Sequence, residues 1–298
     1  MQWIKRRRLI GLAGLLIVLA ALVGYALYNN GRPAPVTMKR QLFPGVTYRR
    51  VVRYLPRFMI VHLLEIDTRS RGLEFFVTKP DRPNAGAPLD ARTTSAFLQE
   101  FGARIAINGD GFQPWWSRSP ADYYPHPGDP VTPNGFTASY GEIYARGAAD
   151  ETAEPTLYIS RRNELTFNKI PGRVFHAISG DRMLVLQGEP ISDLNREELD
   201  PRTAIGTNKN GRWVYLVVID GRQPFYSEGA SLAELADLMV DFGAYFAMNL
   251  DGGGSSTLVI AGQNGEPVIL NSPIDSYIPG RERPVADHLG IYVPTAEK

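Results

Sequence analysis

One eleven-residue pattern occurs twice in the chain, and it constrains the fold more than any other feature. Residues 101–111 (FGARIAINGDG) and 242–252 (FGAYFAMNLDG) are identical at seven of eleven positions. In each copy a helix-like stretch ends at a glycine, a strand of about five residues follows, and an Asn-x-Asp-Gly sequence stands where that strand ends. If a pseudo-twofold axis relates the copies, four side chains converge on one site: Asn108, Asp110, Asn249 and Asp251. The alternative is two unrelated Asx-Gly turns.

The second copy runs directly into a glycine-rich loop, residues 249–257 (NLDGGGSST). Three consecutive glycines are unfavourable for order unless the backbone must approach a ligand or point its N–H groups at an anion. The apolar runs 244–248 and 257–260 on either side are typical of short buried strands. We therefore expect a ligand site built from Asp251 and the residues that follow it: Gly252, Gly253, Gly254, Ser255 and Ser256.

Composition indicates a globular protein and excludes several kinds of site. The chain has 298 residues, of which 44% are hydrophobic and 21% charged, which suits one sizeable core or two small ones. Outside the basic run 5–8 it has 28 basic against 31 acidic residues, without the positive excess that nucleic-acid binding needs. It has no cysteine, so disulfides, thiolate catalysis and cysteine-based zinc sites are excluded. The four histidines show no metal-ligand spacing.

The N-terminus predicts a membrane anchor. Residues 9–28 contain no charge and are long enough to cross a bilayer as a helix. The basic segment 1–8 predicts a cytoplasmic N-terminus, with residues 29–44 as a linker and residues 45–298 as a periplasmic or extracellular domain. We expect a single-pass protein with an uncleaved signal anchor. The alternative is a cleaved signal peptide, whose apolar region would normally be shorter.

The rest of the pattern consists mostly of strands with few helices. Strands are expected at 46–54, 58–67, 73–78, 213–219 and 288–293. Helices are expected at 94–101 and 231–241, the second with a capping box formed by Ser231 and Glu234. We therefore predict an α+β fold, of the mixed α/β kind, with a dominant mixed β-sheet after one transmembrane helix.

A long irregular stretch, residues 113–135, carries two tryptophans, two tyrosines and, from Pro120 to Pro133, five prolines. Loops of this length are often lids or binding loops, and aromatic faces suit the apolar faces of sugar rings. The alternative is a surface excursion whose tryptophans, Trp115 and Trp116, fill the core. The sequence leaves both open.

Several motifs, in order over roughly residues 100–294, resemble the phosphodiester glycosidase family. They are INGDGF (107–112), PRTAIG (201–206), DGR (220–222), the run into NLDGGGSST, and NSP…RERPV…LGIYV (271–293). That family includes an N-acetylglucosamine-1-phosphodiester α-N-acetylglucosaminidase and bacterial exopolysaccharide-associated proteins. The resemblance implies a hydrolase that cleaves a sugar-1-phosphodiester in an envelope or exopolysaccharide-type glycan. The chain departs from the pattern at Asp287-His288, where a small or amide pair is expected.

Such a reaction needs a carboxylate for water or the anomeric carbon. Asp251 and Asp110 are the leading candidates for base or nucleophile, with Glu282 and Asp220 behind them. The phosphate leaving group is already acidic, with a second pKa of ~6. Strong general-acid assistance therefore matters less than in an ordinary glycosidase.

The reaction also needs groups that hold the phosphate. Arg202, with Arg222 or Arg283, would clamp it bidentately, while the loop 252–256 offers N–H groups and serine hydroxyls. For Arg222 and Arg283 a structural salt bridge is the alternative role. Further substrate-binding residues are expected at the other polar positions of the motifs: Asn108, Thr203, Asp220 and Asn249.

The site's cofactor and the function class stay open. Clustered Asp and Asn oxygens also suit Ca²⁺ or Mg²⁺, which would favour attack at phosphorus over attack at carbon, and no metal ligand is assigned. The expected partners are a sugar-phosphate glycan and, through the helix, a membrane. A non-catalytic envelope protein that binds or helps assemble an anionic polysaccharide is the main alternative. A serine hydrolase built on Ser255 or Ser256 is poorly supported, because the chain has no GxSxG.

Overall fold

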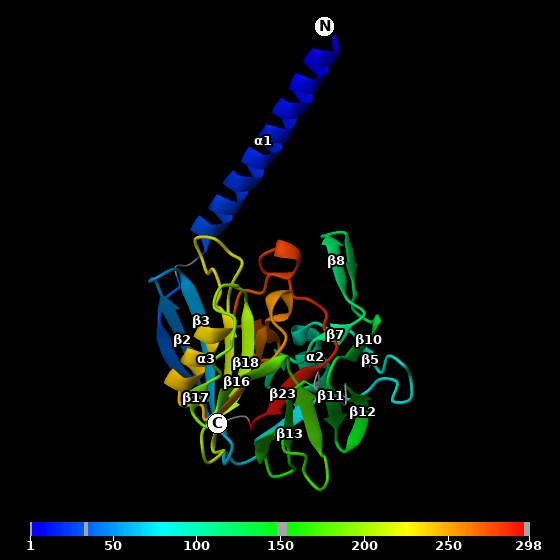
Figure 1. The fold of residues 1–298 in the computed structure, drawn as a ribbon, viewed down its shortest axis with the longest axis vertical. Coiled ribbons are helices and arrows are strands. Elements are labelled where there is room, and N and C mark those ends of the chain that lie inside the picture. Colours follow the sequence, from blue (N-terminus) through cyan, green and yellow to red (C-terminus); the bar gives the residue numbers. More distant parts are fainter. Residues whose placement is uncertain (1, 33–34, 148–153, 295–298) are drawn as a thin grey trace. The chain divides into compact units, whose positions relative to one another are not determined.

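The computed structural model describes residues 2–32, 35–147 and 154–294, and it divides into two compact units, Met1–Val36 and Thr37–Lys298 (Figure 1). The first unit is the helix α1 (Gln2–Gly31), in which Arg6–Tyr28 is long and apolar enough to cross a membrane. This confirms the expected N-terminal apolar helix. Its length and composition fit both a membrane anchor and a signal sequence.

The second unit is built around three antiparallel sheets. The largest has eight strands in the order β1-β2-β3-β19-β18-β20-β16-β17. Their bounds are β1 (Met38–Phe43), β2 (Val46–Arg53), β3 (Met59–Asp67), β16 (Arg182–Leu186), β17 (Glu189–Pro190), β18 (Arg202–Thr207), β19 (Trp213–Ile219) and β20 (Phe246–Asn249). The second sheet has the order β22-β21-β6-β23-β4. Its strands are β4 (Glu74–Val77), β6 (Ile105–Asn108), β21 (Leu258–Ala261), β22 (Pro267–Ile269) and β23 (His288–Tyr292).

The third sheet has the order β12-β11-β15-β13-β14. Its strands are β11 (Phe136–Ser139), β12 (Glu142–Arg146), β13 (Thr156–Ile159), β14 (Leu165–Phe167) and β15 (His176–Ser179). Two small sheets join β5 (Leu89–Asp90), β7 (Phe112–Gln113) and β10 (Pro130–Pro133), and β8 (Trp116–Ser119) with β9 (Asp122–Tyr124). The short helices are α2 (Thr94–Phe101), α3 (Leu232–Asp241), η1 (Gly253–Ser255) and η2 (Asp275–Tyr277).

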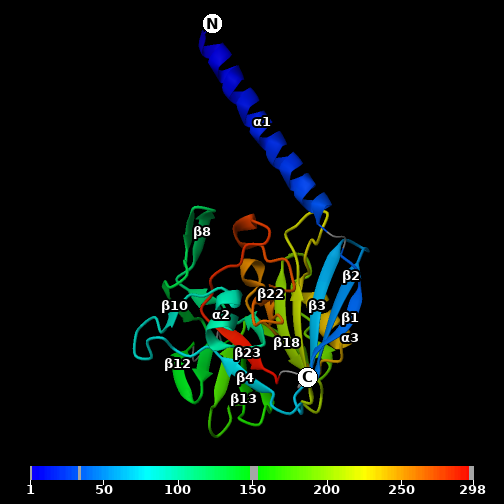
Figure 2. The same ribbon diagram turned by 180° about the vertical axis from the view of Figure 1, so that it is seen from behind.

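The main core lies between the eight-stranded first sheet and the second sheet. Ile205 and Val218 of the first sheet pack there with Ile107 and Leu289 of the second. A second cluster packs α3 against the other face of the eight-stranded sheet, and a third packs α2 against β6 and β21. Strand β3 is buried on both faces because it lies inside this layered arrangement. Figure 2 shows α2 and α3 on opposite sides of the two sheets.

The predicted α+β class is confirmed, but the sheets differ from the expected mixed sheet. Every strand pairing that the structure describes is antiparallel. The physical reason is that β18 lies between β19 and β20. The connection through α3 therefore joins two strands of like direction that are not hydrogen-bonded to each other.

The second unit also begins earlier than residue 45. Residues 38–43, expected to be part of a linker, form the edge strand β1, which pairs with β2 across a tight turn. That turn contains Gly45, whose φ of 72° is a conformation that glycine adopts readily.

The aromatic stretch 113–135 is not irregular. It contains β7, β10 and the β8–β9 hairpin, which projects from the unit (Figure 1). Both tryptophans are partly exposed instead of filling the core, and Trp116 stacks on Tyr124 with 4.7 Å between ring centroids. This favours the binding-loop interpretation over the core-filling one.

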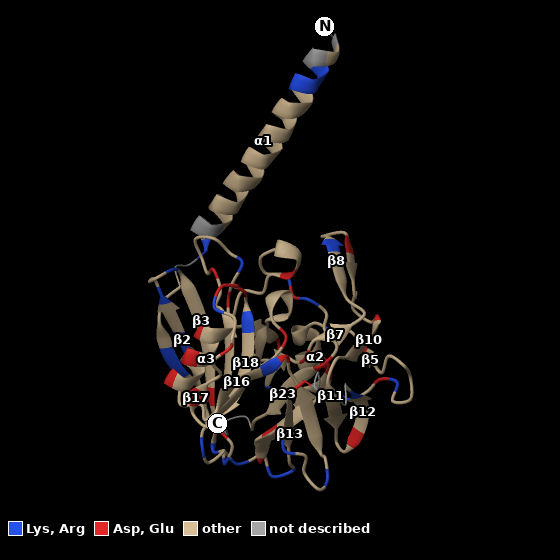
Figure 3. Cartoon of the chain, in the orientation of Figure 1, with Lys and Arg blue, Asp and Glu red and all other residues tan. Residues whose placement is uncertain are grey.

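The two copies of the repeat adopt the same local structure in different sheets. Both helices begin at a capping hydroxyl, Thr93 or Ser231, and each ends at a glycine in the left-handed region, Gly102 or Gly243. The following strands are β6 and β20, so the two Asn-x-Asp-Gly turns meet where the sheets adjoin. Figure 3 shows acidic and basic residues intermixed over this unit.

Candidate active site

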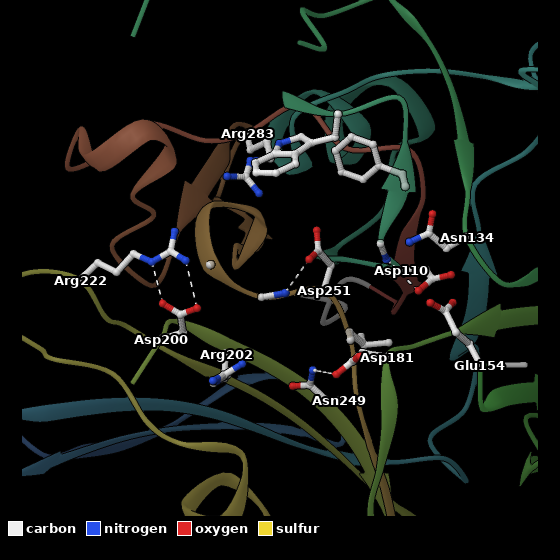
Figure 4. Close-up of a pocket in the computed structure, with 16 residues that line it drawn as sticks. Asp110, Asn134, Glu154, Asp181, Asp200, Arg202, Arg222, Asn249, Asp251 and Arg283 are labelled. Carbon is white, nitrogen blue, oxygen red and sulfur yellow. Dashed lines mark hydrogen bonds and ion pairs between the residues drawn. The ribbon is translucent and has the colours of Figure 1, made fainter. Parts of the chain in front are cut away.

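A pocket of about 410 Å³ lies where the two turns meet (Figure 4). The residues predicted from sequence that line it are Asp110, Arg202, Arg222, Asn249, Asp251, Gly252, Gly253 and Arg283. Trp115, from the aromatic stretch considered as a binding loop, also lines it, as do four residues that were not selected from the sequence: Asn134, Glu154, Asp181 and Asp200. Figure 4 shows the arginines on one side, Asp110 and Glu154 on the other, and Asp251 between them. The pocket therefore has a cationic end and an acidic end.

The two Asn-x-Asp-Gly turns are hydrogen-bonded to each other directly. The Asp251 N–H donates to the Gly109 carbonyl (2.9 Å), and Asn108 Nδ2 donates to the Asp251 carbonyl (2.7 Å). Asn108 Oδ1 also accepts from the Thr203 hydroxyl at 2.9 Å. Asn108 and Thr203 are fully buried beneath the pocket, where they hold the turns together and do not line it.

Arg202 stands apart from the other two arginines at the cationic end. Its Nε donates to the Ala230 carbonyl (3.0 Å) and its Nη2 to the Glu198 carbonyl (2.9 Å). No carboxylate in the described part of the chain forms an ion pair with it. Burial lowers the pKa of its guanidinium, but arginine remains protonated. The pocket thus contains a buried positive charge that is not neutralised by an ion pair.

The other two arginines have carboxylate partners. Arg222 donates to both oxygens of Asp200 (2.7 and 3.0 Å). Arg283 donates to Asp275 at 2.8 Å, and its guanidinium lies over the Trp115 ring, 4.8 Å from the centroid. The structural salt bridges considered from sequence are therefore present, although both residues also line the pocket.

The glycine loop makes room for these guanidinium groups. A Cβ atom at Gly253 would lie 3.0 Å from Arg222 Nη2, and one at Gly254 would lie 2.5 Å from Arg283 Nη2. Gly253 also has a φ of 58°, which side chains rarely allow. Gly253 and Gly254 thus leave room for the arginine side chains, whereas Gly252 leaves room for the Pro201 carbonyl, 2.9 Å from where its Cβ would lie.

We expected the N–H groups of the loop to face an anion in the pocket, but three of them donate hydrogen bonds within the protein instead. The Gly252 N–H donates to Asp251 Oδ1 (2.9 Å) and the Gly253 N–H to the Pro201 carbonyl (2.8 Å). The Ser255 N–H donates to the Gly252 carbonyl (3.1 Å), and both Ser255 and Ser256 are buried. The loop shapes the site, and anion contacts are left to the arginines.

Asp251 is held rigidly at the centre. One carboxylate oxygen accepts from the Gly252 N–H and the other from the Ser255 hydroxyl. Burial raises the pKa of Asp251, while the positive charge of Arg283 and these two hydrogen bonds oppose the rise. The side chain is thus an oriented carboxyl group beside the cationic end.

The acidic end contains a cluster of buried carboxyl groups. Asp110 accepts from the Gly111 and Gly135 N–H groups (2.7 Å each), and its carboxyl group faces that of Glu154 (Figure 4). Burial, with the negative charges of Asp287 and Glu154, raises the pKa of Asp110 well above its ordinary value. Burial likewise raises the pKa of Glu154. Both facing carboxyl groups are therefore harder to ionise than ordinary ones.

Asp287, the departure noted in the sequence, lies directly behind Asp110. Its Oδ1 accepts from the Asp110 N–H at 2.9 Å, and its Oδ2 is buried without a hydrogen-bond partner among the described residues. Burial raises the pKa of Asp287 from 3.8 to about 7. A carboxyl group at this position is therefore protonated over much of the acidic range.

This shift predicts how Asp287→Asn changes stability with pH. The folded state binds the Asp287 proton more tightly than the unfolded state, so this stabilisation is present below the unfolded pKa and is lost as pH rises through the folded pKa. Each pKa unit corresponds to about 1.4 kcal/mol. We expect the variant's free energy of unfolding to fall less than the parent's between about pH 4 and pH 8. Urea unfolding of the full chain in detergent measures this, with Asp122→Asn on the exposed hairpin as the control, and equal slopes for all three proteins would contradict it.

Two predicted acids lie outside the pocket. Asp220 is fully buried, with His62 Nε2 3.1 Å from its Oδ2 and the Ser272 N–H donating to its Oδ1 (2.6 Å). Glu282 accepts from the Ser95 N–H (3.0 Å) in the first turn of α2, where a carboxylate stabilises a helix N-terminus. The structure therefore gives Asp220 and Glu282 contacts that hold the fold together.

Polar residues near the pocket do not form an evident metal centre. Among the described residues, no group of three or more His, Asp or Glu side chains is arranged to hold a metal ion. Asn249 donates to Asp181 at 3.4 Å, and its Oδ1 is buried without a partner in the described part of the chain.

Solved structures share this fold. A hypothetical protein from Synechocystis matches with a TM-score of 0.57 at 15% identity, over 88% of this chain and 64% of its own length. The zebrafish N-acetylglucosamine-1-phosphodiester α-N-acetylglucosaminidase catalytic domain, auto-inhibited by its pro-peptide, matches with a TM-score of 0.55 at 18% identity, over 88% of this chain and 85% of its own. An exported protein from Burkholderia pseudomallei matches with a TM-score of 0.55 at 17% identity, over 79% and 74%.

Sequence comparison gives the family. No curated protein matches the chain. The family model described as phosphodiester glycosidase matches residues 101–292, which include both Asn-x-Asp-Gly turns and every pocket residue named above. That match spans more than half of the chain, and the chain therefore belongs to the phosphodiester glycosidase family.

Proposed function

We propose that the second unit hydrolyses a glycosyl phosphodiester, with the phosphate at the cationic end of the pocket and the sugar at the acidic end. The observation that carries this proposal is the guanidinium of Arg202, which lines the pocket without a carboxylate partner among the described residues. A buried cation of this kind is stabilised by an anionic ligand. Family membership supports the same reaction class.

Asp251 is the group we assign to the reacting carbon. Asp251 lies between the two ends (Figure 4), and a substrate bound as proposed would have the bond that joins sugar to phosphate beside it. Its carboxylate either attacks the anomeric carbon or takes a proton from the attacking water. The C1–O bond breaks, and the electron pair leaves with the phosphate monoester. The two hydrogen bonds from Gly252 and Ser255 fix the carboxylate for this step.

The two ends of the pocket play different parts in this scheme. Arg202, Arg222 and Arg283 offset the charge that develops on the departing phosphate. Asp110 and Glu154 form hydrogen bonds with sugar hydroxyls, for which a protonated carboxyl group can donate and an ionised one can accept. Asp110 also remains a candidate for proton transfer to or from water.

Location and context belong to the same proposal. We propose that α1 anchors the chain in a membrane, with its basic N-terminus in the cytoplasm and the second unit in the periplasm or outside the cell. The substrate is then an envelope or exopolysaccharide-type glycan. A protein that binds such a glycan without cleaving it would use the same pocket, with Trp115 against the sugar.

Hydrolysis in ¹⁸O-labelled water tests the bond that breaks. The full chain is given a panel of sugar-1-phosphodiesters, with and without chelator, and the products are examined by mass spectrometry. We expect turnover, with the label in the sugar hydroxyl, because attack is at carbon. Label in the phosphate would reject the glycosidase mechanism, and no turnover across the panel would favour the binding protein.

A further inference from the structure

Four neighbouring loops expose large apolar side chains, and three of them also contribute residues to the pocket. The loops are 54–58 after β2, 222–228 after β19, 275–283 around η2, and 114–124 with the β8–β9 hairpin. Their most exposed members are Leu55 (85%), Phe225 (83%), Tyr277 (74%) and Trp115 (48%); we term these four the apolar rim. All four loops lie at the end of the second unit from which β8 projects (Figures 1 and 2).

Hydrogen bonds and ring contacts make these loops one continuous surface. The Glu228 N–H donates to the Phe58 carbonyl (2.9 Å) and links the first two loops. The Arg222 guanidinium lies over the Tyr277 ring, 5.6 Å from its centroid. The hydroxyls of Ser117 and Ser276 are 2.9 Å apart and link the hairpin to the η2 loop.

The backbone holds two rim residues in an uncommon conformation. Phe225 has a φ of 65° and Tyr277 a φ of 61°. Bulky residues seldom adopt the left-handed region, and such strain is typical of positions with a function. Exposed aromatic residues beside a pocket also form the kind of patch that marks an interaction site.

The short segment between the apolar span and the second unit bears on which partner this surface contacts. The Thr37 hydroxyl accepts from the Val52 N–H at 3.1 Å, so the second unit begins beside the 54–58 loop. Residues 29–36 separate Thr37 from the apolar span that ends at Tyr28. Even fully extended, this connection reaches only roughly 30 Å. A compact unit of this size is roughly 45–50 Å across. An apolar span that anchors the chain therefore holds Thr37 within roughly 30 Å of the bilayer, which is less than the width of the unit.

We propose that the apolar rim contacts the lipid bilayer, so that the pocket takes glycosyl phosphodiesters carried by membrane lipids. Aromatic and aliphatic side chains of this kind enter the interfacial region of a bilayer. Trp115, Arg222 and Arg283 belong to the pocket as well as to these loops, so a phosphodiester at the lipid headgroup level meets the cationic end first. The substrate class rests on the proposed reaction, whereas the bilayer contact rests only on the proposed anchoring by α1.

Single-cysteine labelling tests the contact, because the chain has no native cysteine. The full chain is reconstituted in phosphatidylcholine vesicles with Leu55→Cys or Phe225→Cys and an environment-sensitive fluorophore. Ile170→Cys is the matched control, since Ile170 is 74% exposed and lies between β14 and β15 of the third sheet, whose strands β12 and β13 lie away from β8 (Figure 1). Brominated lipids are expected to quench the first two labels at least about twofold more than the third. Equal quenching at all three positions would overturn the proposal, and so would energy transfer between copies in place of quenching, which would assign the rim to a second chain.

Activity measurements provide the second test, which concerns the substrate class. The variant Leu55→Ser/Phe225→Ser is compared with the parent on the phytanyl and methyl diesters of one sugar 1-phosphate, the first in vesicles and the second in solution. We expect the double variant to be slowed about tenfold on the phytanyl ester and unchanged on the methyl ester. If the double variant and the parent turned over the phytanyl ester at the same rate, and likewise the methyl ester, the proposed substrate class would be wrong. No turnover of either ester by the parent would reject the proposed function and leave the quenching result standing.

Discussion

Replacing Asp251 by Asn is expected to lower kcat/KM by about 10³-fold or more, because it removes the carboxylate that we assign to the reacting carbon. The fold should survive the change. An amide oxygen still accepts from the Gly252 N–H, and the Ser255 hydroxyl, which now donates to the carboxylate, can turn to accept from the amide N–H. The measurement is steady-state kinetics on the best substrate of the phosphodiester panel.

Asp181→Asn is the matched control for this variant. Asp181 lines the same pocket but pairs at the surface with Arg182 at 2.8 Å, so its loss should change kcat/KM less than about tenfold. Thermal unfolding should give similar midpoints for the parent and both variants. Activity of Asp251→Asn within a factor of ten of the parent would remove Asp251 from the chemistry.

Local structure in this chain follows from local sequence. The helices at 94–101 and 232–241 begin at a hydroxyl cap and end at a glycine, and the apolar runs at 59–67 and 213–219 are strands. These features depend on neighbouring residues and on propensity, which a sequence displays directly. The repeated pattern likewise brought out Asp110 and Asp251, which line the pocket.

The sequence did not reveal the directions in which neighbouring side chains point. Arg283 lines the pocket, but the side chain of the preceding Glu282 turns to the N-terminus of α2. Asp220 stands two residues before Arg222, yet its carboxylate points inward to His62. Which side of a segment faces a site depends on tertiary packing.

The rest of the site could not be predicted, because it depends on contacts between residues that are far apart in the sequence. Glu154 lies in a segment without a motif, and only the pairing of the third sheet brings it to Asp110. Asp181 belongs to the turn pattern Ser179-Gly180-Asp181 and Asp200 precedes the PRTAIG motif, so both carried a weak signal. The antiparallel order could not be inferred either, because it depends on β18 lying between β19 and β20.

Replacing Arg202 by Met is expected to raise KM and lower kcat/KM by about 10²-fold, because the clamp loses its one guanidinium without a carboxylate partner among the described residues. Met keeps much of the side chain's length and apolar stem. The most direct measurement is competitive inhibition by inorganic phosphate, whose inhibition constant should rise by a similar factor.

The ion pairs seen in the structure set the order of effects for the other arginines. Arg222→Met should weaken phosphate inhibition less than Arg202→Met, because the charge of Arg222 is already offset by Asp200. Arg212→Met should leave it unchanged, since Arg212 pairs with Asp67 at 2.7 Å and does not line the pocket. If phosphate inhibits Arg202→Met as strongly as it inhibits the parent, the cationic end does not bind the phosphate. An unpaired buried guanidinium would then need another anion, such as a carboxylate on the sugar, and glycans with acidic sugars would be the compounds to test in its place.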